Sequence, residues 1–408
     1  MLFPGVELGI CNTPPPFAPA LFEHLQPAKI VFGWGRRREL GQHAAAVGRR
    51  ALIVTGSRAL ERTGTYTELA AILAEHAMEA IPLAEIHREP LVADVDQAVA
   101  AARRRTLEPG DFVLAIGGGS ALDLGKAVAG LAPNHEGNSV ADYLEGVGRN
   151  LALTQPPLPL VAMPTTAGTG SEATKNAVIS SHEPAYKKSL RAAALIPRLV
   201  LIDPELTVGV PSDVTAHTGM DAITQLIESY LSCRAQPFTR ALALDGLRYA
   251  LPAIRDAVRE GSARPPREAM AYAALLSGIA LANSGLGLAH GVAAALGVQA
   301  NVAHGLACAM MLPPALQANR AACEGEYATL ARCIPGSIPE GAGRQADFFV
   351  EWIAALVDDL KIPRRLSDLG VRREQLPALV AGSHGNSLNG NPRPIGDLEL
   401  ARMLESLL

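Results

Sequence analysis

Short apolar runs alternate with alanine-rich stretches along the first half of the chain. Residues 51–54, 112–116, 158–163 and 199–202 form such runs, and helical patterns follow around residues 66–76 and through residues 126–131. Alternation of short apolar strands with helices is typical of βα units and of a mostly parallel sheet. The pattern therefore predicts an α/β fold for this half.

The pattern changes after residues 203–205, where clear strand signals stop and alanine-rich helical windows follow one another. Pro204 and Pro211 lie at this point, and prolines that punctuate a chain in this way favour a break between structural units. We therefore expect an α/β domain over residues 1–205 and an all-helical domain over residues 206–408.

One long segment, residues 269–319, contains no Asp, Glu, Lys or Arg. Polar residues such as Asn283 and Gln299 interrupt it, and it is richer in Ala and Gly than in Leu and Ile. A membrane-spanning helix needs about 20 predominantly apolar residues in succession. We therefore interpret the segment as helices buried in a protein core, and we expect no membrane partner.

Charge and cysteine content narrow the class of protein. The formal net charge is −4, and no run of five like charges occurs, whereas nucleic-acid binding normally needs a basic patch. No nucleic-acid partner is expected. The five widely spaced cysteines contain no Cys-x-x-Cys pair, which favours reduced thiols in a cytoplasmic protein. The first 27 residues do not have the pattern of a signal peptide.

A triplet of glycines follows the second predicted strand and precedes a helix. Backbone N–H groups at such a turn, together with about half a positive charge at the helix N-terminus, can hold a phosphate. Gly118, Gly119 and Ser120 are the candidates. The spacing is not the Gly-x-Gly-x-x-Gly of a Rossmann turn, so a plain strand-to-helix turn stays open. Asp123 would then only stabilise the first helical turn, and Lys126 would be a solvated residue.

A second loop, residues 164–172, also follows a predicted strand and reads Pro-Thr-Thr-Ala-Gly-Thr-Gly-Ser-Glu. Its hydroxyls, including those of Thr165, Thr166 and Thr169, can donate to a polyphosphate or a ribose. A solvated loop without a ligand is the alternative. Two such loops after parallel strands favour a binding site, because open α/β sheets bind ligands at the carboxyl ends of their strands.

Candidate metal ligands lie in the second half of the chain. Asp221 and Gln225 are four residues apart in a helical stretch and so share one face, and His290 and His304 lie inside the uncharged segment. A carboxylate with two imidazoles suits zinc or iron(II), and three protein ligands with an open position are typical of a catalytic site. Either histidine could also be a satisfied core residue, and His217 is a rival ligand.

Together these motifs resemble the iron-containing (group III) alcohol dehydrogenase family. The resemblance runs from about residue 28 to Gly-Asn-Pro-Arg-Pro at residues 390–394. It rests on Gly-Gly-Gly-Ser-x-x-Asp-x-x-Lys at 117–126, the loop at 164–172, Thr-Gly-Met-Asp-Ala at 218–222, and His-Gly at 290–291 and at 304–305. Several motifs in the same order over most of the chain make the match specific.

The resemblance implies a Rossmann-like dinucleotide-binding domain, an all-helical domain, and a cleft between them that holds NAD or NADP and a divalent iron or zinc ion. It implies that Asp221, His290 and His304 are both metal ligands and the catalytic set. It also implies a homodimer or a larger homo-oligomer. The residues that it assigns to the dinucleotide are Ser57, Gly118, Gly119, Ser120, Asp123, Thr165, Thr166, Thr169 and Lys187.

Three positions depart from the family pattern. The family usually has a histidine as fourth ligand where this chain has Gln225, and an amide oxygen binds a borderline ion less well. A three-ligand set still works in the related zinc-dependent glycerol dehydrogenases. Many relatives have another histidine where Ala294 stands, so a proton relay through that position is absent. NAD-preferring relatives commonly have an Asp after the strand that corresponds to residues 51–54, where it would repel the 2′-phosphate of NADP. Here Thr55 is followed by Gly-Ser-Arg, so the chain lacks that carboxylate and NADP is acceptable.

The activity that the resemblance implies is reversible hydride transfer between a nicotinamide and a small alcohol or aldehyde, with a metal that polarises the substrate oxygen. A metal-independent enzyme similar to maleylacetate reductase is one alternative, although residues 269–319 offer no cation for a dicarboxylate. A dinucleotide-binding protein without catalysis is another. Against it stands the retention of Asp221, His290 and His304.

Overall fold

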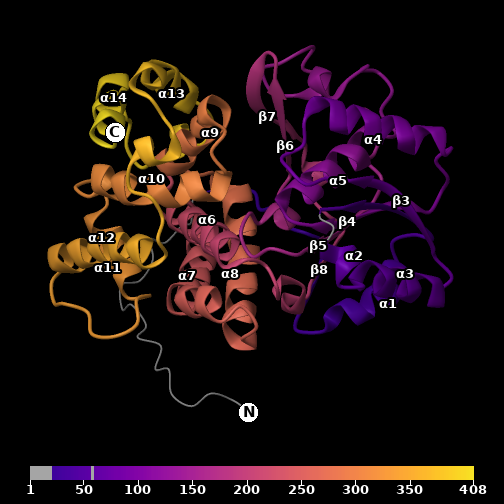
Figure 1. Cartoon of the computed structure of the whole chain (residues 1–408), viewed down its shortest axis with the longest axis horizontal. Helices are drawn as coiled ribbons and strands as arrows, with labels where there is room; N and C mark the ends of the chain where they lie inside the picture. Colours follow the sequence, from indigo (N-terminus) through magenta and orange to yellow (C-terminus); the bar gives the residue numbers. More distant parts are fainter. Residues whose placement is uncertain (1–20, 57–58) are drawn as a thin grey trace.

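The computed structural model describes residues 21–56 and 59–408 and shows two lobes side by side (Figure 1). The N-terminal lobe is a six-stranded parallel sheet with helices on its faces, and the C-terminal lobe is built of helices (Figure 1). The last strand ends at Ile202 and the first helix of the second lobe begins at Ser212. The predicted fold class, α/β followed by all-helical, is confirmed.

The large sheet has the strand order β1-β8-β5-β4-β2-β3, with every neighbouring pair parallel. Its strands are β1 (Lys29–Phe32), β2 (Arg50–Thr55), β3 (Glu79–Glu85), β4 (Asp111–Gly117), β5 (Leu160–Pro164) and β8 (Leu199–Ile202). The helices of this lobe are α1 (Leu40–Ala44), α2 (Ala59–Arg62), α3 (Thr65–Glu75), α4 (Val92–Arg104) and α5 (Gly119–Leu131).

Helices on both faces explain why the strands are continuous apolar runs. Every residue of β4 is buried. Val113 and Ala115 belong to the core on the α5 side, while Leu114 and Ile116 belong to the core on the α3 side. A parallel sheet covered on both faces needs apolar side chains in both directions. The central strands were therefore visible in the sequence.

Two parts of the N-terminal lobe were not predicted. β3 lies at the edge of the sheet and is only partly buried, and Pro82 interrupts its short apolar run at residues 80–84. β6 (Asn176–His182) and β7 (Ala185–Arg191) form an antiparallel hairpin outside the large sheet. Their polar, half-exposed residues carry little strand signal.

The C-terminal lobe is arranged around α6, which packs against α7, α8 and α10. Its helices are α6 (Ser212–Leu231), α7 (Pro237–Arg259), α8 (Arg264–Ser284), α9 (Leu288–Ala300), α10 (His304–Asn319), α11 (Glu324–Ala331), α12 (Ala342–Asp359), α13 (Leu376–Ser383) and α14 (Asp397–Ser406). The uncharged segment forms most of α8, together with α9 and α10. Among the described residues no single helix meets the length and hydropathy of a membrane span, and α8 and α9 meet them only jointly, across a bend of 98°.

The two lobes touch through backbone where Gly170 meets α8. A Cβ on Gly278 would lie 2.2 Å from the carbonyl oxygen of Gly170, so no larger residue fits there without movement. Gly170 itself has a φ of 60°, which glycine adopts without strain. This close approach places the hydroxyl-rich loop of the first lobe against the helices of the second.

Candidate active site

A cavity of about 700 Å³ lies between the two lobes. The glycine and hydroxyl loops, the β6–β7 hairpin and parts of α6, α9 and α13 contribute to its wall. The residues singled out from the sequence that line it are Gly118, Gly119, Ser120, Asp123, Thr166, Thr169, Lys187, Asp221, Gln225, His290 and His304. The fold therefore brings both predicted loops and the candidate metal ligands Asp221, Gln225, His290 and His304 to one cavity, whereas the rival ligand His217 is not among the residues that line it.

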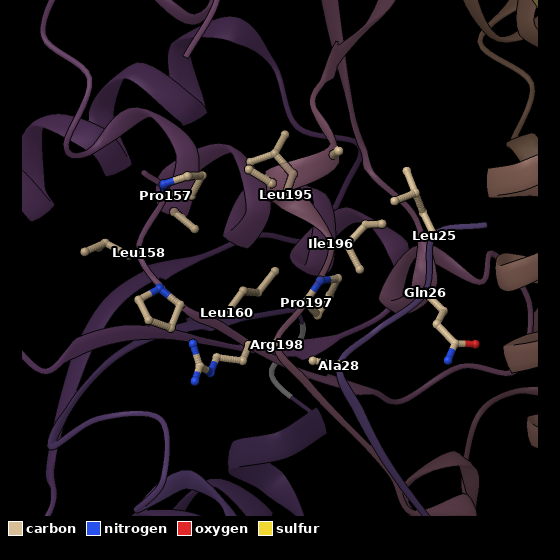
Figure 2. A pocket seen from close by; sticks show the side chains of 14 residues that line it. Leu25, Gln26, Ala28, Pro157, Leu158, Leu160, Leu195, Ile196, Pro197 and Arg198 are labelled. Carbon is tan, nitrogen blue, oxygen red and sulfur yellow. The ribbon is translucent and has the colours of Figure 1, made fainter. Parts of the chain in front are cut away.

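A smaller hollow of about 350 Å³ lies elsewhere on the N-terminal lobe (Figure 2). Leu158, Leu195 and Ile196 are among its lining side chains, and Arg198 is the one titratable residue among them (Figure 2). A pocket without a pair of titratable or metal-binding groups offers no chemistry comparable to that of the larger cavity. We therefore place the candidate site between the lobes.

The glycine triplet makes a tight turn from β4 into α5. A Cβ on Gly117 would lie 2.8 Å from the Cα of Gly56, and one on Gly119 would lie 2.8 Å from the side chain of Thr169. Glycine is thus needed for the end of β4 to approach the end of β2, and for the start of α5 to approach the hydroxyl-rich loop. The first turn of a helix has unpaired N–H groups and a partial positive charge. At the start of α5, Gly118, Gly119 and Ser120 bring this unpaired, partly positive helix end to the cavity. A pyrophosphate needs such a helix end.

Two of the assigned dinucleotide residues are not placed at the cavity. The backbone N–H of Thr165 donates to the carbonyl of Gly117 at 3.0 Å and so ties the end of β5 to that of β4. Thr165 is not among the residues that line the cavity. Ser57 lies outside the described residues, as does the neighbouring arginine that suggested acceptance of NADP. Their roles stay predictions.

Asp123 joins the glycine loop to the two elements beside it. It accepts hydrogen bonds from the hydroxyl of Ser171 at 2.5 Å, from the backbone of Val178 at 3.1 Å and from Lys126 at 3.2 Å. Lys126 is fully buried and also donates to Thr174 at 2.9 Å, so the interpretation of a solvated lysine is wrong. Burial lowers the pKa of Lys126. This network fixes the hairpin and the hydroxyl loop against α5.

Lys187 comes to the cavity from β7 and forms an ion pair there. Its ammonium lies 2.5 Å from a carboxylate oxygen of Glu89, which also lines the cavity. Burial raises the pKa of Glu89, but the charge and hydrogen bond of Lys187, together with His304 and Ser180, outweigh it and lower that pKa. Glu89 was not identified from the sequence, since nothing in its local pattern points to Lys187 on a distant hairpin.

Four side chains converge at the end of the cavity that the helical lobe forms. Asp221 from α6, His290 from α9 and His304 and Cys308 from α10 offer ligand atoms that all lie within 4.8 Å of one another. Nε2 of His290 lies 3.2 Å from Oδ1 of Asp221, and Nε2 of His304 lies 4.0 Å from the same oxygen. Cys308 was missed, although its place four residues after His304 puts both on one helix face.

Glu228 supports this cluster from behind. One of its carboxylate oxygens lies 2.7 Å from Nδ1 of His290 and accepts from the backbone of Gly287 at 2.9 Å, and the other accepts from the backbone of Ala289 at 2.6 Å. It therefore caps the N-terminus of α9 and orients the ring that follows. Glu228 was not predicted, although it lies two helical turns after Asp221 on the same face.

The donor set fits a divalent cation. The Glu228 carboxylate accepts a hydrogen bond from Nδ1 of His290, so Nε2 of the neutral ring has a lone pair. That lone pair faces an oxygen of Asp221, and two such acceptors can lie this close only with a proton or a cation between them. Burial opposes charge on His290, but Cys308, Asp221 and Glu228 together raise its pKa well above the ordinary value. Burial, and next the Lys187 charge, lower the pKa of His304 to about 4, so its ring is neutral and able to bind metal.

The pKa of Asp221 also favours a cation at this point. Burial raises the pKa of the Asp221 carboxyl, but its interactions with His304, His290 and the Cys308 thiol lower it below the ordinary value. The carboxylate is therefore ionised although it is almost fully buried. A carboxylate, a neutral imidazole and a second imidazole oriented by Glu228 match the ligands and the outer partner of a zinc or iron(II) site.

Gln225 lines the same cavity, but both ends of its amide are engaged. Its oxygen accepts from the hydroxyl of Ser277 at 2.6 Å, and its nitrogen donates to the carbonyl of Thr169 at 3.3 Å. Ala294 also lines the cavity, so no side chain that could carry a proton stands at that position. The proposed ligand role of Gln225 stays a prediction.

Cationic residues line the cavity, but they lie outside the uncharged segment 269–319. They are Lys175, Lys187, Lys188, Arg191 and Arg234. All except Arg234 come from the β6–β7 hairpin and the residue before it. Their position weakens the argument that the site lacks positive charge for an acidic substrate.

Comparisons with known proteins agree with this geometry. Residues 27–204 match the family model described as iron-containing alcohol dehydrogenase, and residues 215–408 match that of the C-terminal domain of the same family. The chain belongs to the iron-containing alcohol dehydrogenase family. Its members are nicotinamide-dependent, so the protein is an oxidoreductase that acts on CH–OH groups and uses NAD or NADP with a divalent metal.

Individual relatives cover almost the whole chain. A 1,3-propanediol dehydrogenase of Klebsiella pneumoniae is 34% identical over 93% of this chain and 97% of its own length. The crystal structure of a 1,3-propanediol oxidoreductase has a TM-score of 0.86 at 32% identity and covers 95% of this chain and 100% of that one. A sulfoacetaldehyde reductase from Bifidobacterium kashiwanohense in complex with NAD+ has a TM-score of 0.85 at 30% identity, with 95% and 99% covered.

Proposed function

We propose that this alcohol dehydrogenase interconverts a small alcohol, such as a short primary alcohol or diol, and its aldehyde in the cavity between the lobes. The observation that supports this most strongly is the convergence of Asp221, His290 and His304 on the cavity that also contains the start of α5. Substrate oxygen and nicotinamide could therefore meet there. The 1,3-propanediol enzymes among the relatives favour a diol or a short alcohol.

The N-terminal lobe would bind the dinucleotide. Gly118, Gly119 and Ser120 at the start of α5 are suited to the pyrophosphate, because free N–H groups and the helix dipole favour an anion there. The hydroxyls of Thr166 and Thr169 face the same cavity and can donate to phosphate or ribose. Asp123 would act mainly by holding the hydroxyl loop in place, since three donors already occupy it.

The helical lobe would bind the metal and the substrate. Asp221, His290 and His304 would hold the metal, which when bound supplies a Lewis acid for the substrate oxygen and lowers the pKa of an alcohol hydroxyl. Glu228 keeps the Nδ1 proton of His290, and so leaves the Nε2 lone pair free for the cavity side. The helices exclude water from Asp221 and His290, both of which are almost fully buried.

Substrate and cofactor choice can be tested together. Purified protein is assayed with a panel of short alcohols and diols, with NAD and NADP in parallel, after loading with zinc or iron. We expect alcohol-dependent reduction of a nicotinamide, with His290→Ala and His304→Ala inactive but still able to bind the dinucleotide. A loaded enzyme that is inactive on every alcohol and aldehyde would overturn the proposed substrate class.

An acidic substrate is a second candidate, because Lys187, Lys188 and Arg234 line the cavity. An enzyme similar to maleylacetate reductase would reduce an unsaturated dicarboxylate and would not need the metal. The same assay run with maleylacetate, before and after chelation of metal, separates the two. Faster reduction of maleylacetate that survives chelation would support this candidate over the first.

We also propose a division into functional domains at residues 205 and 206, and a homo-oligomer in the cytoplasm. Apolar exposure supports the oligomer: Leu21 and Phe22 are exposed, and the ring of Phe238, also exposed, lies 4.3 Å from that of His24. The free thiols of the described cysteines are consistent with a reducing compartment. Light scattering on the purified chain, together with a Phe238→Ser variant, tests the oligomer.

A further inference from the structure

Helix α10 supplies two of the four side chains in the metal cluster. His304 and Cys308 are one helical turn apart, and Sγ of Cys308 lies 3.7 Å from Nε2 of His304. Around a tetrahedral zinc ion, with Zn–S of about 2.3 Å and Zn–N and Zn–O of about 2.0–2.1 Å, the S···N edge is about 3.6 Å and the N···O edge about 3.3 Å. The observed 3.7 Å, and the 3.2 Å between His290 and Asp221, are close to these edges.

Gln225 is the competing fourth ligand, but its amide is already committed. Its oxygen accepts the hydroxyl hydrogen of Ser277, a residue with no exposed surface, at 2.6 Å. Turning this oxygen toward a cation would disturb the two bonds that position the amide, although the Ser277 hydroxyl would keep a second acceptor, the carbonyl of Ala274 at 2.8 Å. Cys308 needs no such rearrangement, because its sulfur already belongs to the cluster of ligand atoms.

The side from which Cys308 approaches also matters. Asp221, His290 and His304 line the cavity, whereas Cys308 does not and has no exposed surface. Its sulfur therefore closes the ligand set on the protein side. A substrate oxygen would approach from the cavity side as a fifth neighbour, an expansion that catalytic zinc sites can undergo.

We propose that Cys308, and not Gln225, is the fourth protein ligand of the metal, and that the resulting Asp/His/His/Cys site prefers zinc to iron. This inference rests on the proposed metal role of Asp221, His290 and His304. When the sulfur–metal bond forms, the S–H bond breaks and its proton passes to water. Thiolate is a soft ligand that favours zinc, whereas an oxygen ligand does not make that distinction.

X-ray absorption at the zinc edge tests this on the full-length protein loaded with zinc. We expect one sulfur neighbour at about 2.3 Å beside nitrogen and oxygen neighbours at about 2.0–2.1 Å. Cys308→Ser should lose the sulfur neighbour. Cys323→Ser and Cys333→Ser remove other buried thiols that lie outside the cluster, and both should keep the sulfur neighbour.

The outcomes separate this inference from the proposed function. Protein that binds one zinc per chain with only nitrogen and oxygen neighbours would overturn the role of Cys308 and leave the metal site standing. Protein that takes up no zinc would overturn the metal site and the inference with it. If Cys308→Ser does not fold, cobalt-loaded wild-type protein decides, since a cobalt–thiolate bond gives a near-ultraviolet charge-transfer band and its absence would contradict the inference.

Discussion

His290 lies between two carboxylates, and each interacts with one of its ring nitrogens. Glu228 holds Nδ1 at 2.7 Å, while Asp221 faces Nε2 at 3.2 Å. A buried imidazole in this position must carry either a second proton or a metal ion on Nε2. The behaviour of the whole site therefore depends on a residue, Glu228, that does not line the cavity.

Replacement of Glu228 should weaken the metal site without removing a ligand. In Glu228→Gln the side-chain oxygen can still accept from Nδ1, but the negative charge that supports His290 is lost. Outer partners of metal-binding histidines typically contribute about 10–100-fold in affinity. We expect a loss of that size in zinc affinity, measured by competition with a chelator, whereas Glu260→Gln, at an exposed site of the same lobe, should leave the affinity unchanged.

Glu172 should make the stability of the protein depend on pH. Burial raises its pKa from 4.5 to about 7, against the opposing effects of a backbone hydrogen bond and the Lys126 charge. The folded state then binds a proton more tightly than the unfolded state does. The stabilisation of the folded state that comes from protonated Glu172 is therefore fully present below pH 4.5 and is lost as the pH rises to about 7.

The variant Glu172→Gln removes this dependence. As the pH rises from 4.5 to about 7, the free energy of unfolding of the wild-type protein should fall relative to that of the variant by up to roughly 3 kcal/mol. Each unit of difference between the folded and unfolded pKa contributes about 1.36 kcal/mol. Urea unfolding of both proteins at pH 5 and pH 8 measures it. Curves that stay parallel across this range would show that Glu172 does not titrate as described.

Among the elements, the contact between the glycine loop and the hydroxyl loop is sterically the most demanding. A Cβ on Gly119 would meet the side chain of Thr169 at 2.8 Å. Gly119→Ala should push the two loops apart, and overpacking of this kind costs about 1–3 kcal/mol. We expect a rise in the dissociation constant for the dinucleotide of about tenfold or more, with the metal content unchanged.

Gly325→Ala provides the matched control for that prediction. Gly325 lies in α11, and a Cβ there meets no atom within 4 Å. This substitution should leave dinucleotide binding unchanged and, because alanine favours a helix over glycine, slightly raise stability. Equal binding by both variants would mean that the loops do not need their close approach.

The elements also show what the sequence could and could not reveal. β4 and β5 were predictable because helices cover both faces of the sheet, so their residues must be apolar in succession. The hairpin β6–β7 has no such requirement and was missed, although it carries Lys187. Asp221, His290 and His304 could be named from motifs. Cys308 and Glu228 had only a local signal, their helical spacing from His304 and Asp221, whereas Glu89 had none, because its partner Lys187 lies on a distant hairpin.

At the scale of the whole molecule, each lobe supplies half of the site. In the proposed reaction the N-terminal lobe would bind the dinucleotide phosphates at the start of α5, and the helical lobe would hold the metal at its cluster of ligand atoms. The backbone contact between Gly170 and Gly278 holds the hydroxyl loop against α8, beside the helix that carries Asp221. Hydride transfer needs both halves at once, because the nicotinamide and the substrate oxygen must lie next to each other.

The most direct test is a metal titration of activity. Protein freed of metal by a chelator is supplied with increasing zinc or iron, and alcohol-dependent reduction of the nicotinamide is recorded at each step. We predict that activity is absent at the start and rises in proportion to the metal until about one ion per chain is bound. Full activity in the protein that has been freed of metal would contradict a reaction that depends on Asp221, His290 and His304 holding a cation.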